Sequence, residues 1–238
     1  KVLKGLDNNN KYIIPDLIGF GFSDKIKLSE HSLEAHSKWM AEFFLSIKEE
    51  KIGLVVHDWG GMIGIAGAMK AGKKIDGLVV MNTAITAPKD GFKPTWFHSL
   101  SQVPLISSFL FRGLNFPLSF LNRFASVPGS FDSQTMKAYK YPLRKFKNNS
   151  GPLALARMVP NSMHHPSVQL EQEIEEYLKA YDGPAQIIWG MNDPVMWKLR
   201  RRTSRLLPQA KVVKTPAGHF VQEETPAEVI TAIKEVFK

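Results

Sequence analysis

The chain has 238 residues, of which 44% are hydrophobic and 22% charged, a composition typical of globular proteins and not of disordered, collagen-like or low-complexity chains. It contains no cysteine, which excludes disulfides, thiolate metal sites, iron–sulfur clusters and cysteine nucleophiles. Apolar runs such as residues 53–56 and 78–81 are far shorter than the roughly 20 residues that a membrane-spanning helix needs. We therefore expect a soluble, cytoplasmic protein with no membrane span.

The net charge of +9 is unevenly distributed along the chain. Between Pro88 and Pro166 there are ten Lys and Arg residues but only two acidic ones, so +8 of the +9 lies in this stretch. A basic chain suggests a nucleic acid partner, but charge confined to one stretch favours a solvated surface. The basic run at residues 200–202 is interpreted in the same way, as an exposed helix face. We expect no nucleic acid partner.

Five short apolar runs, each bounded by Gly, Pro, Asn or Asp, predict buried strands at residues 12–14, 53–56, 77–81, 185–189 and 211–213. Apolar residues at helical spacing follow between most of them, at residues 33–47, 62–71 and 170–178. This alternation predicts an α/β fold with a mostly parallel sheet flanked by helices. A last helix is predicted from Thr225, whose hydroxyl would form a capping box with Glu228.

The stretch between residues 88 and 166 interrupts this alternation. It is richer in Phe, Pro, Ser and Arg than the rest and contains no run typical of a buried strand, only short amphipathic pieces such as residues 105–114. We interpret it as a helical insertion, called the cap segment below (residues 88–166), in a core formed by residues 1–87 and 167–238.

The most informative motif lies at residues 54–61, LVVHDWGG, where a predicted strand runs into two glycines and a small-residue helix. In a nucleophile elbow the reactive side chain occupies such a tight corner, and small residues nearby make the corner possible. Asp58 occupies the corner here. An Asp at a helix start also serves as an N-cap, so the motif alone leaves both interpretations open.

Two further polar residues follow predicted strands. Asp193 comes after the strand at 185–189, and His219 comes after the strand at 211–213. Because parallel strands end at the same edge of a sheet, both side chains should lie near Asp58. The order nucleophile, acid, histidine is that of a catalytic triad in α/β hydrolases. We therefore predict Asp58, Asp193 and His219 as catalytic residues.

Three blocks resemble haloalkane dehalogenases: VVHDWGG (55–61), IPDLIGFGFSDK (14–25) and AGHFVQE (217–223). The resemblance covers the core from residue 12 to the C-terminus and is weak in the cap segment. It implies an α/β-hydrolase fold in which Asp58 attacks carbon, Trp59 binds the halide and His219 activates water. In this family the triad acid follows the strand before or after the cap. The earlier strand offers only Asn82, so Asp193 is the predicted acid.

The residue types are consistent with this chemistry. A carboxylate displaces a leaving group from an sp³ carbon and forms an alkyl ester on Asp58. His219, oriented by Asp193, then activates the water that hydrolyses the ester, while the indole N–H of Trp59 stabilises the leaving halide. The expected partners are a small haloalkane, water and halide, and we expect a monomer. No cofactor is required, and the pair His164 and His165 lacks the carboxylates of a metal site.

Two alternatives remain open. An epoxide hydrolase uses the same Asp nucleophile with cap tyrosines, for which Tyr139 and Tyr141 are candidates. A module that kept the fold without the chemistry is the other. The resemblance also implies earlier strands, with a second oxyanion donor and a second halide donor, before residue 1, and we expect this chain to be incomplete there. Trp96 is the one tryptophan of the cap segment that could serve as a second halide donor.

Overall fold

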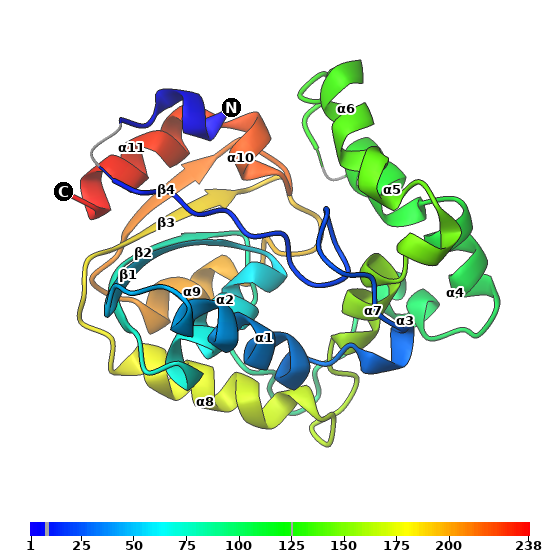
Figure 1. Ribbon diagram of the computed structural model, residues 1–238, viewed down its shortest axis with the longest axis horizontal. Coiled ribbons are helices and arrows are strands. Elements are labelled where there is room, and N and C mark those ends of the chain that lie inside the picture. The colour runs from blue at the N-terminus through cyan, green and yellow to red at the C-terminus, as the bar shows by residue number, and fades with distance from the viewer. Residues whose placement is uncertain (8–9, 125) are drawn as a thin grey trace.

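A parallel sheet forms the centre of the computed structural model, which describes residues 1–7, 10–124 and 126–238. Its strands pair in chain order. They are β1 (Lys51–His57), β2 (Lys74–Met81), β3 (Ala185–Gly190) and β4 (Lys211–Thr215). All four carboxyl ends therefore lie at one edge of the sheet, as Figure 1 shows. The predicted α/β class and parallel sheet are confirmed.

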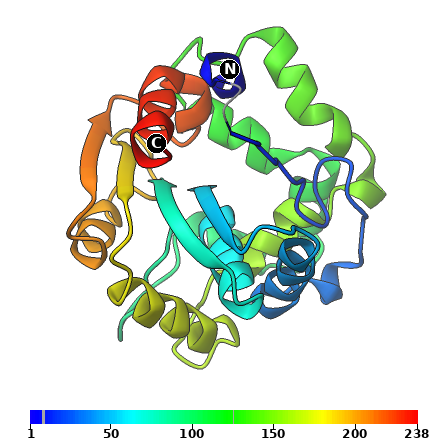
Figure 2. The same cartoon turned by 60° about the vertical axis from the view of Figure 1, so that its left-hand side comes forward.

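Helices cover both faces of the sheet (Figures 1 and 2). The alternation along β2 explains why: Leu78 and Val80 are buried with one set of helices, whereas Val79 and Met81 are buried with another. The first set comprises α1 (Leu33–Leu45), α2 (Trp59–Lys70), α8 (Ser167–Lys179) and α9 (Arg200–Leu206), and α11 (Pro226–Val236) packs on the second face. The short α10 (Val221–Glu224) precedes α11.

The cap segment is helical in the structure. It contains α3 (Trp96–Ser101), α4 (Ile106–Ser108), a π-helical turn η3 (Phe109–Gly113), α5 (Phe116–Phe124), α6 (Ser133–Lys140), the 3-10 turns η4 (Tyr141–Leu143) and η5 (Phe146–Asn148), and α7 (Gly151–Met158). Phe111, Leu153 and Ala156 form a small cluster of their own here. Figure 1 shows these helices on one side of the sheet, beyond the carboxyl ends of the strands. The exact boundaries of the cap segment remain a prediction.

The predicted strand at residues 12–14 is wrong. Residues 11–17 form neither a helix nor a strand, and within the described part of the chain no strand pairs with them. Tyr12 packs beside the α11 cluster, whereas Ile14 is 69% exposed. A strand requires a neighbour for its backbone N–H and C=O groups, and an apolar run alone does not supply one. Two 3-10 turns flank this segment, η1 (Val2–Gly5) and η2 (Leu28–Glu30).

Candidate active site

Asp58 lies at the corner between β1 and α2 with a φ of 48° and a ψ of −129°. A positive φ is rare for a residue other than glycine and is often found at functional sites. Three hydrogen bonds hold this backbone: the Asp58 N–H donates to the Asn82 carbonyl (3.1 Å), and the Asp58 carbonyl accepts from Thr83 Oγ1 (2.6 Å) and the Gly61 N–H (3.1 Å). The Asp58 side chain makes no capping hydrogen bond to α2, so the N-cap interpretation does not describe its carboxylate.

The two glycines after Asp58 have different surroundings. A Cβ at Gly61 would collide with the Thr83 hydroxyl that binds the Asp58 carbonyl, whereas a Cβ at Gly60 would meet nothing within 4 Å. The small residue required by the corner is therefore Gly61.

Asp193 and His219 lie together after β3 and β4. His219 Nδ1 hydrogen-bonds Asp193 Oδ2 at 2.9 Å, and both residues are buried. Burial alone would raise the pKa of Asp193, but the hydrogen bond from His219 and its charge lower it. Burial alone would lower the pKa of His219, but the hydrogen bond and charge of Asp193, together with the charges of Asp58 and Glu224, raise it. The carboxylate and the imidazolium stabilise each other.

Asn82 at the end of β2 fixes the orientation of Asp193. It is fully buried, and its Nδ2 donates to Asp193 Oδ2 (2.9 Å) and to the Gly190 carbonyl (3.1 Å), while its Oδ1 accepts from the Gly190 N–H (2.8 Å). The other carboxylate oxygen, Oδ1, accepts from the Val195 and Met196 N–H groups at 2.8 and 3.1 Å. Asp193 is thus held as a hydrogen-bonded carboxylate.

The backbone around His219 is held from both sides. The Glu224 carboxylate accepts from the N–H groups of Gly218 (2.9 Å) and Phe220 (3.1 Å). The His219 carbonyl accepts from His57 Nε2 at 2.7 Å, which places the His57 proton on that nitrogen because a carbonyl only accepts. Burial, and then the charge of His219, lower the pKa of His57 to about 4.

Glu224 also binds the cap segment, because its Oε2 accepts from the Val127 N–H at 2.8 Å. The AGHFVQE block, which predicts the role of His219, ends one residue before Glu224. Sequence reasoning missed the roles of Glu224 and His57, since both depend on contacts that only the fold creates.

Trp59 and His98 both carry ring N–H groups; Trp59 follows Asp58 in the chain, and His98 interacts with the charge of Asp58. Trp59 is the first residue of α2 and packs partly buried against the main core. His98 lies on α3 of the cap segment, with its Nδ1 at 2.7 Å from Thr95 Oγ1. Burial lowers the pKa of His98, and the charge of Asp58 opposes this effect. Sequence reasoning also missed the interaction of His98 with Asp58. Trp96 is instead 61% exposed.

The two candidate tyrosines for epoxide chemistry, Tyr139 and Tyr141, interact with residues other than Asp58. The Tyr139 hydroxyl donates to Glu223 Oε1 (3.1 Å), and burial and the charge of Glu223 raise its pKa. Tyr141 is 52% exposed and lies under the Arg144 guanidinium. Neither hydroxyl is placed at Asp58 by these contacts.

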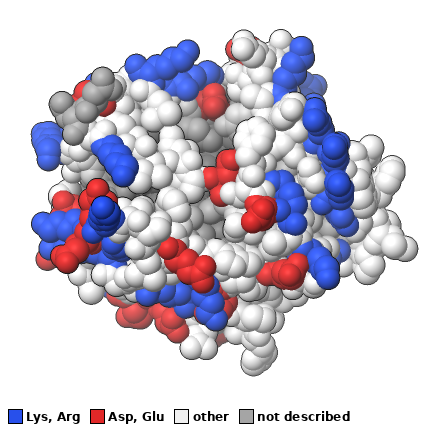
Figure 3. All heavy atoms as spheres, in the orientation of Figure 1, with Lys and Arg blue, Asp and Glu red and all other residues white. Residues whose placement is uncertain are grey.

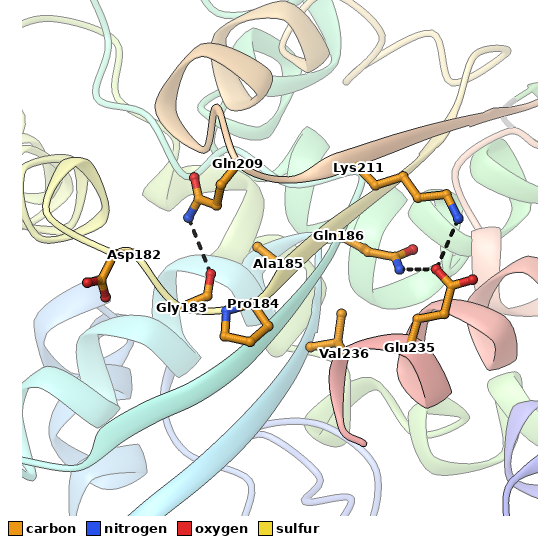
Figure 4. Close-up of a pocket in the computed structure, with 9 residues that line it drawn as sticks. All are labelled: Asp182, Gly183, Pro184, Ala185, Gln186, Gln209, Lys211, Glu235 and Val236. Carbon is orange, nitrogen blue, oxygen red and sulfur yellow. Dashed lines mark hydrogen bonds and ion pairs between the residues drawn. The ribbon is translucent and has the colours of Figure 1, made fainter.

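A hollow of about 430 Å³ lies at the opposite edge of the sheet, by the first residues of β3 and β4. Figure 4 shows that its polar side chains bind one another, because Glu235 accepts from both Gln186 and Lys211 (3.0 Å for Lys211). It is therefore separate from the triad.

Among the described residues no group of three His, Asp or Glu is placed to hold a metal ion, and none of the described helices is long and apolar enough to cross a membrane.

The chain matches one family model over most of its length. The family model described as the alpha/beta hydrolase fold matches residues 1–226. The chain belongs to the α/β-hydrolase fold family. Among solved structures, this α/β hydrolase resembles a haloalkane dehalogenase of Agrobacterium tumefaciens C58 (TM-score 0.78, 20% identity, 92% of this chain, 77% of that chain). It likewise resembles a loop variant of a haloalkane dehalogenase of Bradyrhizobium elkanii (TM-score 0.80, 18% identity, 99% and 84%).

Two curated relatives of the hydrolase carry different names. Haloalkane dehalogenase 1 of Mycobacterium tuberculosis is 28% identical over 225 residues, which is 92% of this chain and 72% of the relative. A cis-3-alkyl-4-alkyloxetan-2-one decarboxylase of Shewanella oneidensis is 28% identical over 239 residues, 98% of this chain and 75% of the relative. The resemblance to haloalkane dehalogenases is confirmed, and a decarboxylase is equally similar.

Proposed function

We propose that this α/β hydrolase hydrolyses small haloalkanes to alcohol, halide and a proton through an alkyl ester on Asp58. The observation that supports the proposal most directly is the conformation of Asp58. Its backbone is held at a positive φ, while its carboxylate makes no capping hydrogen bond to the helix that follows. A structural Asp at that position would cap α2.

In the first step, an Asp58 oxygen attacks the sp³ carbon and the carbon–halogen bond breaks. The halide leaves with the electron pair, and the negative charge moves from Asp58 to the halide. Trp59, next to Asp58 in the chain, donates its indole N–H to the halide. The backbone N–H of Trp59 faces the oxyanion of the second step, as the residue after the nucleophile does in an elbow.

In the second step, His219 removes a proton from water, and the resulting hydroxide attacks the ester carbonyl of Asp58. The tetrahedral intermediate expels the alkoxide, which takes the proton of the attacking hydroxyl and leaves as the alcohol. The Asp58 carboxylate is restored and His219 is left protonated. The charge of Asp58 raises the pKa of His219 before the reaction. Ester formation removes that charge, so the pKa of His219 falls, and the imidazolium releases its proton to solvent before the histidine acts as a base.

A second candidate is the opening of a β-lactone. Displacement by Asp58 at the sp³ ring carbon expels the ring oxygen as a carboxylate. Loss of CO₂ then forms a carbon–carbon double bond as the Asp58 carboxylate leaves. This route consumes no water. Two observations favour it: the decarboxylase relative aligns with 98% of this chain, and His98 interacts electrostatically with Asp58, where an N–H donor would stabilise the carboxylate leaving group.

The deciding experiment follows three products. The protein is incubated separately with bromobutane, chlorobutane and a cis-dialkyl β-lactone, and halide, protons and CO₂ are measured. Equal release of halide and protons with Asp58→Asn as an inactive control supports dehalogenation. Release of CO₂ from the lactone without halide release from either haloalkane selects the second candidate. No turnover of any of these by a folded protein contradicts both.

A further inference from the structure

The outer end of the cap segment exposes an apolar tip. Leu105 is 85% exposed, Ile106 54% and Phe109 62%; Leu105 directly precedes α4, Ile106 begins it and Phe109 begins η3. Exposed aliphatic and aromatic side chains that lie together on a soluble surface mark a contact with another phase or molecule. Figure 3 shows an uncharged surface at this end of the molecule, where Figure 1 places α4.

The tip is held in this position by the fold. Leu105 has a φ of 61°, a conformation unfavourable for a branched side chain. Arg157 of α7 fixes the segment, because its guanidinium donates to the Ser101 carbonyl (2.8 Å) and to Ser107 Oγ (2.9 Å) on either side. The strained backbone at Leu105, held by Arg157, exposes the Leu105 side chain to solvent. Burial of apolar surface would instead favour a conformation that hides this side chain.

A basic surface adjoins the tip. The turns η3, η5 and η4 pack against one another in that order, leading away from α4. They carry Arg112 over the Phe146 ring and Arg144 over the Tyr141 ring, each at 4.2 Å, with Lys145 and Lys147 exposed beside them. Within the described part of the chain, no ion pair neutralises Arg144, Lys145 or Lys147. In Figure 3 a row of Lys and Arg borders the uncharged tip.

We propose that this face docks the protein on an anionic lipid bilayer. Leu105, Ile106 and Phe109 insert between the headgroups, and Arg144, Lys145 and Lys147 bind the lipid phosphates. Such a pairing of an apolar face with a rim of basic and aromatic side chains is typical of interfacial membrane binding. Guanidinium groups stacked on Phe146 and Tyr141 suit the headgroup layer, where amphipathic rings reside.

Nucleic acid fits this face less well. Its phosphates would pair with the basic residues, but a duplex backbone offers no apolar surface for the exposed Leu105 and Ile106 side chains to contact. A bilayer accounts for both halves of the surface. The docking is independent of the reaction catalysed at Asp58, since none of the residues involved contacts the triad in the hydrogen bonds described above.

Vesicle sedimentation tests the proposal. The protein is mixed with vesicles of phosphatidylcholine alone and of equal parts phosphatidylcholine and phosphatidylserine. Strong binding only to the anionic vesicles, weakened by salt, is expected. Leu105→Ser with Ile106→Ser, and Lys145→Glu with Lys147→Glu, should each weaken partitioning at least about tenfold. The matched controls Leu45→Ser and Lys234→Glu, on the exposed sides of α1 and α11, should leave it unchanged.

A second measurement reports insertion without relying on loss of binding. In Phe109→Trp, the fluorescence emission of the added indole should shift to the blue when anionic vesicles are present. The parent protein, which has no indole at position 109, should not show this additional shift. Absence of binding by the parent protein to anionic vesicles overturns the proposal, as does equal binding by all variants. Tighter binding to duplex DNA than to vesicles at equal salt, or a dimer that the tip variants abolish, assigns the face to another partner and also overturns it.

Discussion

His219 has to change its protonation state between the two proposed steps, and its surroundings provide for this. The charges of Asp193, Asp58 and Glu224 raise its pKa in the resting protein. Only Asp58 loses its charge during the reaction. In the proposed mechanism, alkylation of Asp58 would therefore lower the pKa of His219, while the hydrogen bond to Asp193 keeps the ring in place.

His219→Gln should separate the two steps. Because Asp58 alone forms the ester, this variant should release one halide per active site and then stop, with the alkyl group retained. Intact-mass measurement after brief exposure to a bromoalkane reads out the added mass directly. The comparison variant Asp58→Asn should release no halide. An unshifted mass for folded His219→Gln, on a substrate that the parent protein turns over, would show that no ester forms on Asp58.

Glu224→Gln should shift the pH dependence of ester hydrolysis. A glutamine lacks the charge that raises the pKa of His219, and its NH₂ group cannot accept from the N–H groups of Gly218 and Val127. The pH at half-maximal hydrolysis should therefore fall. We also expect kcat to fall by roughly ten- to a hundredfold, because the histidine loop is no longer held, with little change in KM.

The matched control is Glu228→Gln, in the first turn of α11. It should leave the pH profile in place. A loss of kcat in Glu224→Gln with an unshifted pH profile would mean that Glu224 supports the fold only and does not tune His219.

The connection from β1 to α2 shows how one element positions another. Strand β1 ends at His57, directly before Asp58, and Thr83 after β2 binds the Asp58 carbonyl, so two neighbouring strands hold the corner. Gly61 lets Thr83 approach.

The start of α11 behaves differently from its sequence pattern. The predicted capping box is wrong, because Thr225 makes no side-chain cap and its hydroxyl donates to the Val221 carbonyl of α10.

Gly61→Ala and Gly60→Ala should have opposite effects. The new methyl at position 61 displaces Thr83 and disturbs the corner, so we expect a loss of about 1–3 kcal/mol in unfolding free energy together with most of the activity. The methyl at position 60 meets open space, and alanine favours a helix over glycine by about 1 kcal/mol. Urea unfolding and halide release measure both. Equal behaviour of the two variants would contradict this account of the corner.

Buried neutral histidines make the stability of the whole protein sensitive to acid. His31 and His36 bind each other at 2.9 Å, and His36 and His57 have pKa values lowered to about 4, in each case first by burial. The unfolded chain binds protons at an ordinary histidine pKa of about 6.5, so it binds more protons than the folded one between pH 6.5 and 4. Stability should therefore fall as the pH falls through this range.

The Asp193 and His219 pair acts in the other direction. Since the pKa of His219 is raised, its contribution is present below the ordinary histidine value and is lost as the pH rises through the raised one. The contribution of Asp193 persists until the pH falls through its own lowered pKa. Neither group explains a loss of stability as the pH falls from about 6.5 to 4, which is the range in which the buried neutral histidines gain protons on unfolding.

His36→Gln should reduce the acid sensitivity. Glutamine retains a hydrogen-bonding group beside His31 but does not titrate. The difference in unfolding free energy between pH 7 and pH 5, from urea unfolding, should be smaller in the variant by about 1–2 kcal/mol. His164→Gln, at an exposed position, serves as the control and should keep the parental difference. An unchanged difference in His36→Gln would assign the sensitivity to other groups.

Local patterns in the sequence were sufficient for β1, β2, β3 and β4 and for the corner at Asp58. Buried strands need short apolar runs and the corner needs small residues, and both requirements act within a few positions of the chain. The meeting of Asp193 and His219 was also predictable, since residues that follow parallel strands gather at one edge of the sheet. The catalytic roles of the three residues and Trp59 remain predictions.

Tertiary structure alone decided the features that depend on partners far apart in the chain. The apolar run at residues 12–14 needed a neighbouring strand to become one itself, and no described segment supplies it. Asn82, Glu224 and His98 have ordinary sequence surroundings, and they acquire their contacts with Asp193, the His219 loop and Asp58 only when the chain folds. Hydrogen bonds and charge interactions depend on distance in space, which a linear pattern does not contain.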